Sequence, residues 1–230
     1  AAQDANIRYG AAEAVRFAKM GLEALEERAK TISQQEYTET KIRLLLELAK
    51  AEEFGGDPQE QEDHIRAGIA YLENNLSYLE VASNKLQAEV FGQLGKLNKR
   101  KGNIQAQKAK DYLEKALNIY KHDDDKKNVA EILYQLGDVY PDIPPSEENQ
   151  RPADKANEAL KESLSIAKQF QDNELQARCL CSLAWRYAYD NFPYAENCAL
   201  QALELSRNQL NKYSEIKTLN AMAKVSREAV

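Results

Sequence analysis

A small residue recurs four times along the chain at a nearly fixed distance from an apolar anchor, and no other feature restricts the fold as strongly. The small residues close the pairs Leu94-Gly95, Leu136-Gly137, Leu183-Ala184 and Met222-Ala223. An anchor lies 19 or 20 residues before each of them, at Leu76, Leu117, Leu164 and Leu203. Such regular spacing indicates a helical repeat array, a type of fold that usually presents an extended surface to a partner.

The composition favours helices along the whole chain. Only nine Gly and six Pro interrupt 230 residues, of which 30% are charged and 43% are hydrophobic. Ala, Leu, Glu, Lys and Gln dominate, and all of them are good helix formers. Because β-branched residues never alternate over the length of a strand, we predict an all-α fold.

Two apolar patterns alternate, and we assign them to the first (A) and second (B) helix of each repeat. Offsets of 3, 4 and 7 residues place each set on one face of a helix. The A pattern comprises Leu45, Leu48 and Ala49; Phe91, Leu94 and Gly95; Leu133, Leu136, Gly137 and Tyr140; Leu180, Leu183, Ala184 and Tyr187; and Leu219, Met222 and Ala223. The B pattern comprises Ala109, Leu113, Ala116 and Leu117; Ala156, Leu160, Ser163 and Leu164; Ala195, Ala199, Ala202 and Leu203; and a looser copy, Gly68, Leu72, Asn75 and Leu76.

The glycines of the A pattern predict close packing between helices. A Gly inside a helix costs up to about 1 kcal/mol relative to Ala. Its occurrence at two equivalent positions, Gly95 and Gly137, therefore suggests a packing reason. We expect the two helices of a repeat to approach most closely there, because a larger side chain would push the backbones apart.

Residues 40–230 resemble the tetratricopeptide repeat (TPR) family. That family has a bulky residue, then Leu-Gly, then Tyr in helix A, followed by Ala, an aromatic or Leu, and Ala in helix B. Leu133-x-x-Leu136-Gly137-x-x-Tyr140 and Leu180-x-x-Leu183-Ala184-x-x-Tyr187 match this pattern, and residues 194–205 are similar to a family helix B. The resemblance implies a right-handed superhelical solenoid of antiparallel helix pairs.

The repeats are longer than those of a typical family member. The small residues at positions 49, 95, 137, 184 and 223 are 46, 42, 47 and 39 residues apart, whereas a family repeat has about 34 residues. Longer repeats resemble those of kinesin light chains and of the sensor arrays in bacterial transcription regulators and signalling ATPases. A helical array of another family is the alternative.

This reading predicts three parts. Residues 1–34 form an N-terminal helix or cap, residues 35–209 form four TPR-like helix pairs, and residues 210–230 form the C-terminal helix of an incomplete or capping repeat. The first helix is expected to pack through Ala14, Phe17, Leu22 and Leu25. Segments rich in Pro and Gly at 54–58 and 141–152 interrupt two A-to-B turns, and we interpret them as surface insertions.

Charge and residue types argue against several functions. The net charge of −6 disfavours bulk binding to nucleic acid, and no apolar run reaches the roughly 18 residues that suggest a membrane span. Three cysteines, an odd number, suggest reduced thiols in a cytoplasmic protein. The segment Asp123-Asp124-Asp125 lacks the spacing of a calcium loop, so we interpret it as a solvated turn and not as a metal site. We find no catalytic motif, so we predict no enzyme activity and no cofactor.

The family resemblance implies a concave groove lined by helix A. The lining positions would be Arg43, Leu46 and Lys50; Glu89, Gly92, Lys96 and Lys99; Glu131, Tyr134 and Asp138; Arg178, Cys181, Trp185 and Tyr189; and Lys217, Asn220 and Lys224. Among these, we predict that the partner is bound by Arg43, Lys50, Lys96, Tyr134, Arg178, Trp185, Lys217 and Asn220. Two alternatives stay open. In one, Trp185 is partly buried between repeats, and in the other, the lysines form a solvated face without a partner.

Two functional hypotheses follow. In the first, the chain is a protein-protein interaction module whose groove binds a peptide or partner domain, carrying acidic and apolar residues. In the second, it is the ligand-sensing TPR region of a larger bacterial signalling or defence regulator. The chain starts without Met and ends in mid-pattern, so we expect a fragment of a longer protein, although removal of Met would explain the start alone.

Overall fold

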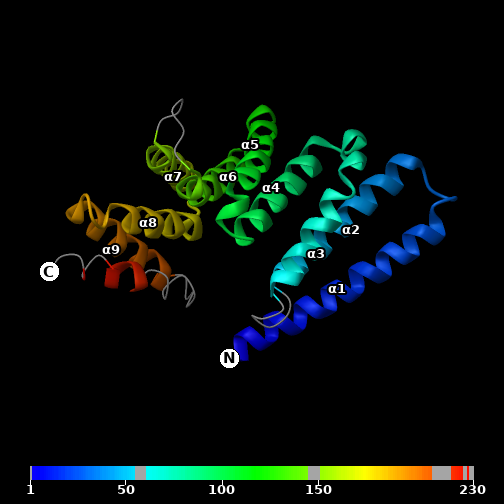
Figure 1. Ribbon diagram of the computed structural model, residues 1–230, viewed down its shortest axis with the longest axis horizontal. Helices are drawn as coiled ribbons and strands as arrows, with labels where there is room; N and C mark the ends of the chain where they lie inside the picture. The colour runs from blue at the N-terminus through cyan, green and yellow to red at the C-terminus, as the bar shows by residue number, and fades with distance from the viewer. Residues whose placement is uncertain (1, 55–60, 145–150, 209–218, 225–226, 228–230) are drawn as a thin grey trace. The chain divides into compact units, whose positions relative to one another are not determined.

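The computed structural model describes residues 2–54, 61–144, 151–208, 219–224 and 227, and the side chains of residues 10–52, 62–144, 151–207, 219–224 and 227. Every regular element in these ranges is helical, as Figure 1 shows, so the all-α prediction is confirmed. The elements are α1 (Ala2–Arg28), α2 (Gln34–Phe54), α3 (Gln61–Glu73), η1 (Leu76–Val81), α4 (Asn84–Arg100), η2 (Asn103–Gln105), α5 (Ala106–His122), α6 (Lys126–Val139), η3 (Tyr140–Asp142), α7 (Pro152–Gln169), α8 (Asn173–Tyr187) and α9 (Phe192–Asn208). A short helical segment, drawn in red, follows at 219–224.

The chain divides into two compact units, Ala1–His122 and Asp123–Val230, and each has its own hydrophobic core. In the first unit, α2 packs against α1 and α3, and α4 packs against α5. In the second unit, α6 packs against α7, and α8 packs against α7 and α9. The fold is therefore built from helix pairs, and four of these pairs coincide with the A and B patterns of the sequence.

Close packing at the glycines is also confirmed. A Cβ atom added to Gly95 would lie 2.5 Å from Cγ of Leu113 and 3.2 Å from the carbonyl oxygen of Ala109. Real Cβ atoms do not approach other atoms at 2.5 Å, so only glycine lets α4 and α5 come this close. Leu113 and Ala109 belong to the B pattern, and both are fully buried.

Helices α6 and α8 begin with the same kind of N-cap. Asp125 and Asp172 are the N-cap residues, and their carboxylates accept hydrogen bonds from the backbone N–H groups of Asn128 and Leu175, respectively. These bonds satisfy donors that a helix leaves unpaired at its first turn. The triple-acid segment before α6 thus forms a helix-starting turn, in which Asp124 has a positive φ of 53°.

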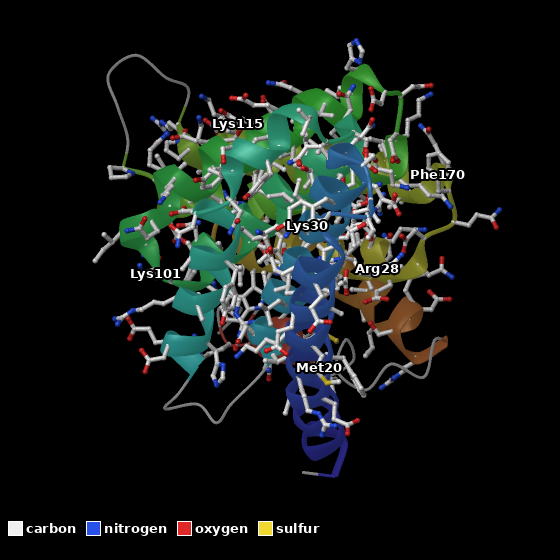
Figure 2. The ribbon with its side chains drawn as sticks, turned by 90° about the vertical axis from the view of Figure 1, so that its right-hand side faces the viewer. Met20, Arg28, Lys30, Lys101, Lys115 and Phe170 are labelled. Carbon is white, nitrogen blue, oxygen red and sulfur yellow. The ribbon has the colours of Figure 1, made fainter. Side chains whose placement is uncertain are left out.

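Three sequence-based assignments of the packing face are wrong in part, although the expected Leu22 and Leu25 of α1 do pack inward. On α1, Ala14 is exposed and Phe17 is 59% exposed, whereas Ala11, Ala18 and Leu25 face α2 in the core. The buried residues are seven apart and mostly small, so the bulkier Phe17 misled the assignment. Figure 2 labels Met20 on this helix, another exposed apolar side chain.

The other two errors concern the ends of repeats. Helix α3 ends at Glu73, so Leu76 lies in the 3₁₀ turn η1, where Leu79 is the buried residue. In segment 219–224, Ala221 is fully buried while Leu219 is 45% exposed and Ala223 is exposed. The register expected from Met222-Ala223 is therefore shifted by two residues.

The interrupting segments fall largely outside the described residues. Positions 55–60 separate α2 from α3, and positions 145–150 separate η3 from α7. Pro152 begins α7, at a position where its missing N–H has no intrahelical partner to lose. In the part of the chain that the structure describes, no helix combines the length and apolar character needed to cross a membrane.

Candidate functional site

The second unit contains a cavity of about 370 Å³ between α6, α8 and segment 219–224. Its lining combines aromatic, small and charged side chains, a mixture common in ligand pockets. The lining residues are Tyr134, Gly137, Asp138, Pro141, Ala177, Arg178, Cys181, Ser182, Trp185, Arg186 and Asn220.

The structure brings four of the eight predicted binding residues together at this cavity. They are Tyr134 from α6, Arg178 and Trp185 from α8, and Asn220 from segment 219–224. The register explains this, because α6 and α8 are both A helices and turn corresponding faces to the same side. Whether these residues bind a partner stays a prediction.

The other four predicted residues do not line this cavity. Arg43 is exposed on α2, and Lys50 on the same helix pairs with Glu47 at 2.7 Å. Lys96 is half-buried on α4. All three belong to the first unit, and Lys217 lies outside the described residues.

Leu46, expected to line the groove, is instead part of the core, and Gly92 is buried as well. Leu46 is only 2% exposed and packs with the apolar residues of the first unit. Helix α2 is covered by α1 on one side and by α3 and α4 on others, so little of its surface remains for a partner. The family register did not predict this, because it placed Leu46 on the open face of its helix.

Arg178 is held rigidly in the cavity wall. Its guanidinium donates two hydrogen bonds of 2.9 Å to the carboxylate of Glu131, and its Cζ lies 4.2 Å from the centre of the Tyr134 ring. Burial opposes the charge of Arg178, but the hydrogen bonds and charge of Glu131 outweigh it and raise the pKa of the guanidinium. Arg178 therefore stays charged, with its bidentate side already committed to Glu131.

Tyr134 and Asp138 form the α6 side of the site. Tyr134 is 8% exposed, and burial, followed by the negative charge of Asp138, raises the pKa of its hydroxyl. The hydroxyl of Ser182 donates to the carboxylate of Asp138 at 3.4 Å. Tyr134 is thus a neutral hydroxyl at every physiological pH, and the fixed negative charge of the cavity belongs to Asp138.

Arg186 is a lining residue that the sequence did not reveal. Its guanidinium donates 2.6 Å and 2.8 Å hydrogen bonds to the side-chain oxygen of Asn157 and the backbone oxygen of Ala153. Both acceptors are neutral, and burial lowers the pKa of Arg186. Its position, two residues after Ala184, is not a lining position in the family pattern, so only the structure could identify it.

Trp185 lines the cavity and keeps part of its side chain exposed. The side chain is 45% exposed, and Tyr189, one turn further along the chain, is 65% exposed. The ammonium nitrogen of Lys224 lies 4.1 Å from the centre of the Trp185 ring and 5.0 Å from that of Tyr189. The ring is half-exposed rather than fully enclosed, which leaves it accessible to a partner.

The cysteines are free thiols in different surroundings. Cys179 is fully buried and donates to the hydroxyl of Ser163 at 3.3 Å, and burial raises its pKa to about 12. Burial also raises the pKa of Cys198, whereas Cys181 is half-buried and lines the cavity. Within the described ranges, no three His, Cys, Asp or Glu side chains are grouped so that they could hold a metal ion.

The fold defines a class of protein. Its helix pairs, with small residues where the two helices meet, form a TPR-like helical repeat fold. Among solved structures, the chain is similar to BtubC (BKLC) from P. vanneervenii. The TM-score is 0.73 at 16% sequence identity, over 95% of this chain and 84% of that one.

Sequence comparison adds no closer assignment. No protein-family model matches the chain, and no curated protein matches it. An identity of 16% supports the fold and leaves the partner unspecified.

Proposed function

We propose that this chain is a protein-interaction module that binds a peptide, or an extended segment of a partner protein, at the cavity of its second unit. The observation that carries the proposal is the convergence of Tyr134, Arg178, Trp185 and Asn220 on one cavity. Aromatic and arginine side chains supply much of the binding energy in protein interfaces. The TPR-like fold supports a scaffold role, because repeat arrays expose such surfaces without catalytic groups.

The charges of the cavity favour a ligand that carries both a carboxylate and an apolar group. Arg178 is already paired with Glu131, so it contributes a fixed wall. Within the described ranges, Arg186 donates its hydrogen bonds to neutral oxygens, so a ligand carboxylate would add a charged acceptor to the nearby charge of Asp138. The exposed face of Trp185 would pack against the apolar group.

The size of the cavity limits how much of a peptide enters it. A volume of about 370 Å³ lies at the lower end of the range for ligand pockets. It would hold an anchoring side chain, while the rest of the peptide lies on the adjoining surface. A short anchor inside a pocket and a longer contact outside it is a common arrangement at protein interfaces.

A selection from a random peptide library on the immobilised 230-residue chain tests the proposal. We expect the recovered peptides to combine Asp or Glu with a large apolar residue, and Trp185→Ala to weaken their binding at least tenfold with an unchanged circular dichroism spectrum. Recovered peptides that bind the parent and Trp185→Ala equally well would place the binding surface elsewhere.

A second candidate function rests on the size of the cavity. A pocket of about 370 Å³ also suits a small molecule, as expected of a ligand-sensing region in a larger bacterial signalling or defence regulator. A thermal-shift screen of anionic metabolites would distinguish the two. A small molecule that stabilises the parent but not Arg186→Gln supports sensing, and stabilisation of both equally speaks against it.

A further inference from the structure

Three groups surround the ammonium nitrogen of Lys224. Besides the rings of Trp185 and Tyr189, the nitrogen lies 3.3 Å from the backbone oxygen of Trp185, to which it donates a hydrogen bond. That oxygen belongs to the last turn of α8, which ends at Tyr187. Carbonyls in the last turn of a helix lack intrahelical donors and carry a partial negative charge, so they attract cations.

The arrangement combines two different attractions for one cation. The faces of Trp and Tyr rings attract an ammonium group within about 6 Å of the ring centre, and both distances here fall inside this limit. The carbonyl adds a directional hydrogen bond. Both rings keep substantial exposure, 45% for Trp185 and 65% for Tyr189, so the site opens to solvent.

We propose that Trp185, Tyr189 and the carbonyl of Trp185 form a binding site for an ammonium group, and that Lys224 of the same chain occupies it. The contact ties segment 219–224 to the end of α8. Asn220 of the same segment lines the cavity, so the tie also closes one side of the proposed peptide site. This last consequence rests on the proposed function, whereas the ammonium site itself does not.

Among the described residues of the segment, few are buried, so the tie adds to a small apolar contact. Ala221 is its fully buried residue and Met222 packs partly against the core, while Leu219 is 45% exposed. Loss of the Lys224 contact should therefore loosen the segment without unfolding the unit. Opening would uncover the Trp185 ring and the adjoining wall of the cavity.

Trp185 is the sole tryptophan of the chain, so its fluorescence reports on this site alone. We would titrate methylammonium chloride into the parent and into Lys224→Met, with sodium chloride at equal ionic strength as the reference. Lys224→Met should respond at an at least threefold lower concentration, because the internal competitor is gone. Adding Tyr189→Leu to Lys224→Met should remove most of that response.

Acrylamide quenching of the same fluorescence gives a second, independent readout. We expect the quenching constant to rise about twofold in Lys224→Met, to stay near the parental value in Lys224→Arg, and to be unchanged in the control Lys168→Met, which removes an exposed lysine of α7. Equal methylammonium responses in parent and Lys224→Met, or quenching that does not change, would overturn the ammonium site.

The peptide proposal is tested separately. A peptide selected on the parent should bind Lys224→Met two- to fivefold more tightly if segment 219–224 closes the cavity. Unchanged peptide affinity together with a positive methylammonium result would leave the ammonium site standing and overturn the closure. Absence of any peptide would count against the proposed function alone.

Discussion

Gly137 on α6 lies so close to Leu160 on α7 that a Cβ atom added to the glycine would stand 2.6 Å from Cγ of the leucine. Gly95 and Leu113 form the same relationship between α4 and α5. At the equivalent positions of α8 and α9 the sequence has Ala184 and Ala199, both fully buried. Equivalent helix pairs thus fill the same space in two ways, either with a glycine facing a leucine or with two alanines.

Gly137→Ala is expected to destabilise the second unit by about 1 kcal/mol, because overpacking outweighs the gain in helix propensity. Gly137→Leu should cost about 3 kcal/mol. Urea unfolding followed by circular dichroism measures both changes. The control is Gly10→Ala on α1, where an added Cβ meets no atom within 4 Å and no loss is expected. Equal effects at Gly10 and Gly137 would contradict the close-packing account.

Combining Gly137→Ala with Leu160→Ala should recreate the alanine pair of the α8–α9 helices. Leu160→Ala alone leaves a cavity and is expected to cost about 2–5 kcal/mol. The double variant should be more stable than the sum of the single effects by about 1 kcal/mol, because the new methyl group fills part of that cavity. Strictly additive losses would show that the two side chains do not compete for one space.

The ion pair between Glu131 and Arg178 should contribute modestly to stability. The side chains keep 35% and 29% exposure, so solvent screens their attraction. We expect a coupling free energy of about 1 kcal/mol in a double-mutant cycle with Glu131→Gln and Arg178→Gln, favoured by the bidentate geometry. A coupling near zero, measured by the same unfolding assay, would mean that the pair only positions the guanidinium over Tyr134.

Much of this fold can be predicted from the sequence because the same helix pair recurs along the chain. Gly95, Gly137 and Leu160 recur with the 3.6-residue period of a helix and lie where two helices must approach closely. Their burial can therefore be predicted from their spacing in the sequence. Leu46 was expected in the groove, but it is buried on α2, a helix that packs against α1, α3 and α4. Tertiary contacts of that kind determine how exposed a side chain is, and they do not appear as a periodic pattern in the sequence.

The candidate site could be predicted only in part. Tyr134, Arg178 and Trp185 follow from the family register, since corresponding faces of α6 and α8 line the cavity. Arg186 does not, because its contact with Asn157 and Ala153 joins α8 to α7 at positions outside that register. The pairing of Arg178 with Glu131, 47 residues earlier, likewise required the structure.

The thiols should react in an order set by burial. In the native protein, Cys181 is expected to react first with 5,5′-dithiobis(2-nitrobenzoate) at pH 8, and Cys179 only on unfolding. Because Cys179 keeps its proton to a pH of about 12, the folded state holds a proton that the unfolded state loses near pH 9. Stability should therefore fall as the pH rises between these values. Prompt native labelling of Cys179 would refute its burial.

The central claim is that the cavity of the second unit binds a peptide through Arg186 and the face of Trp185. Its most direct measurement is the affinity of a library-selected, fluorescently labelled peptide for the parent, Arg186→Gln and the exposed control Arg16→Gln, followed by anisotropy. We predict a loss of at least tenfold for Arg186→Gln and none for Arg16→Gln. Equal affinities for all three proteins would contradict the account.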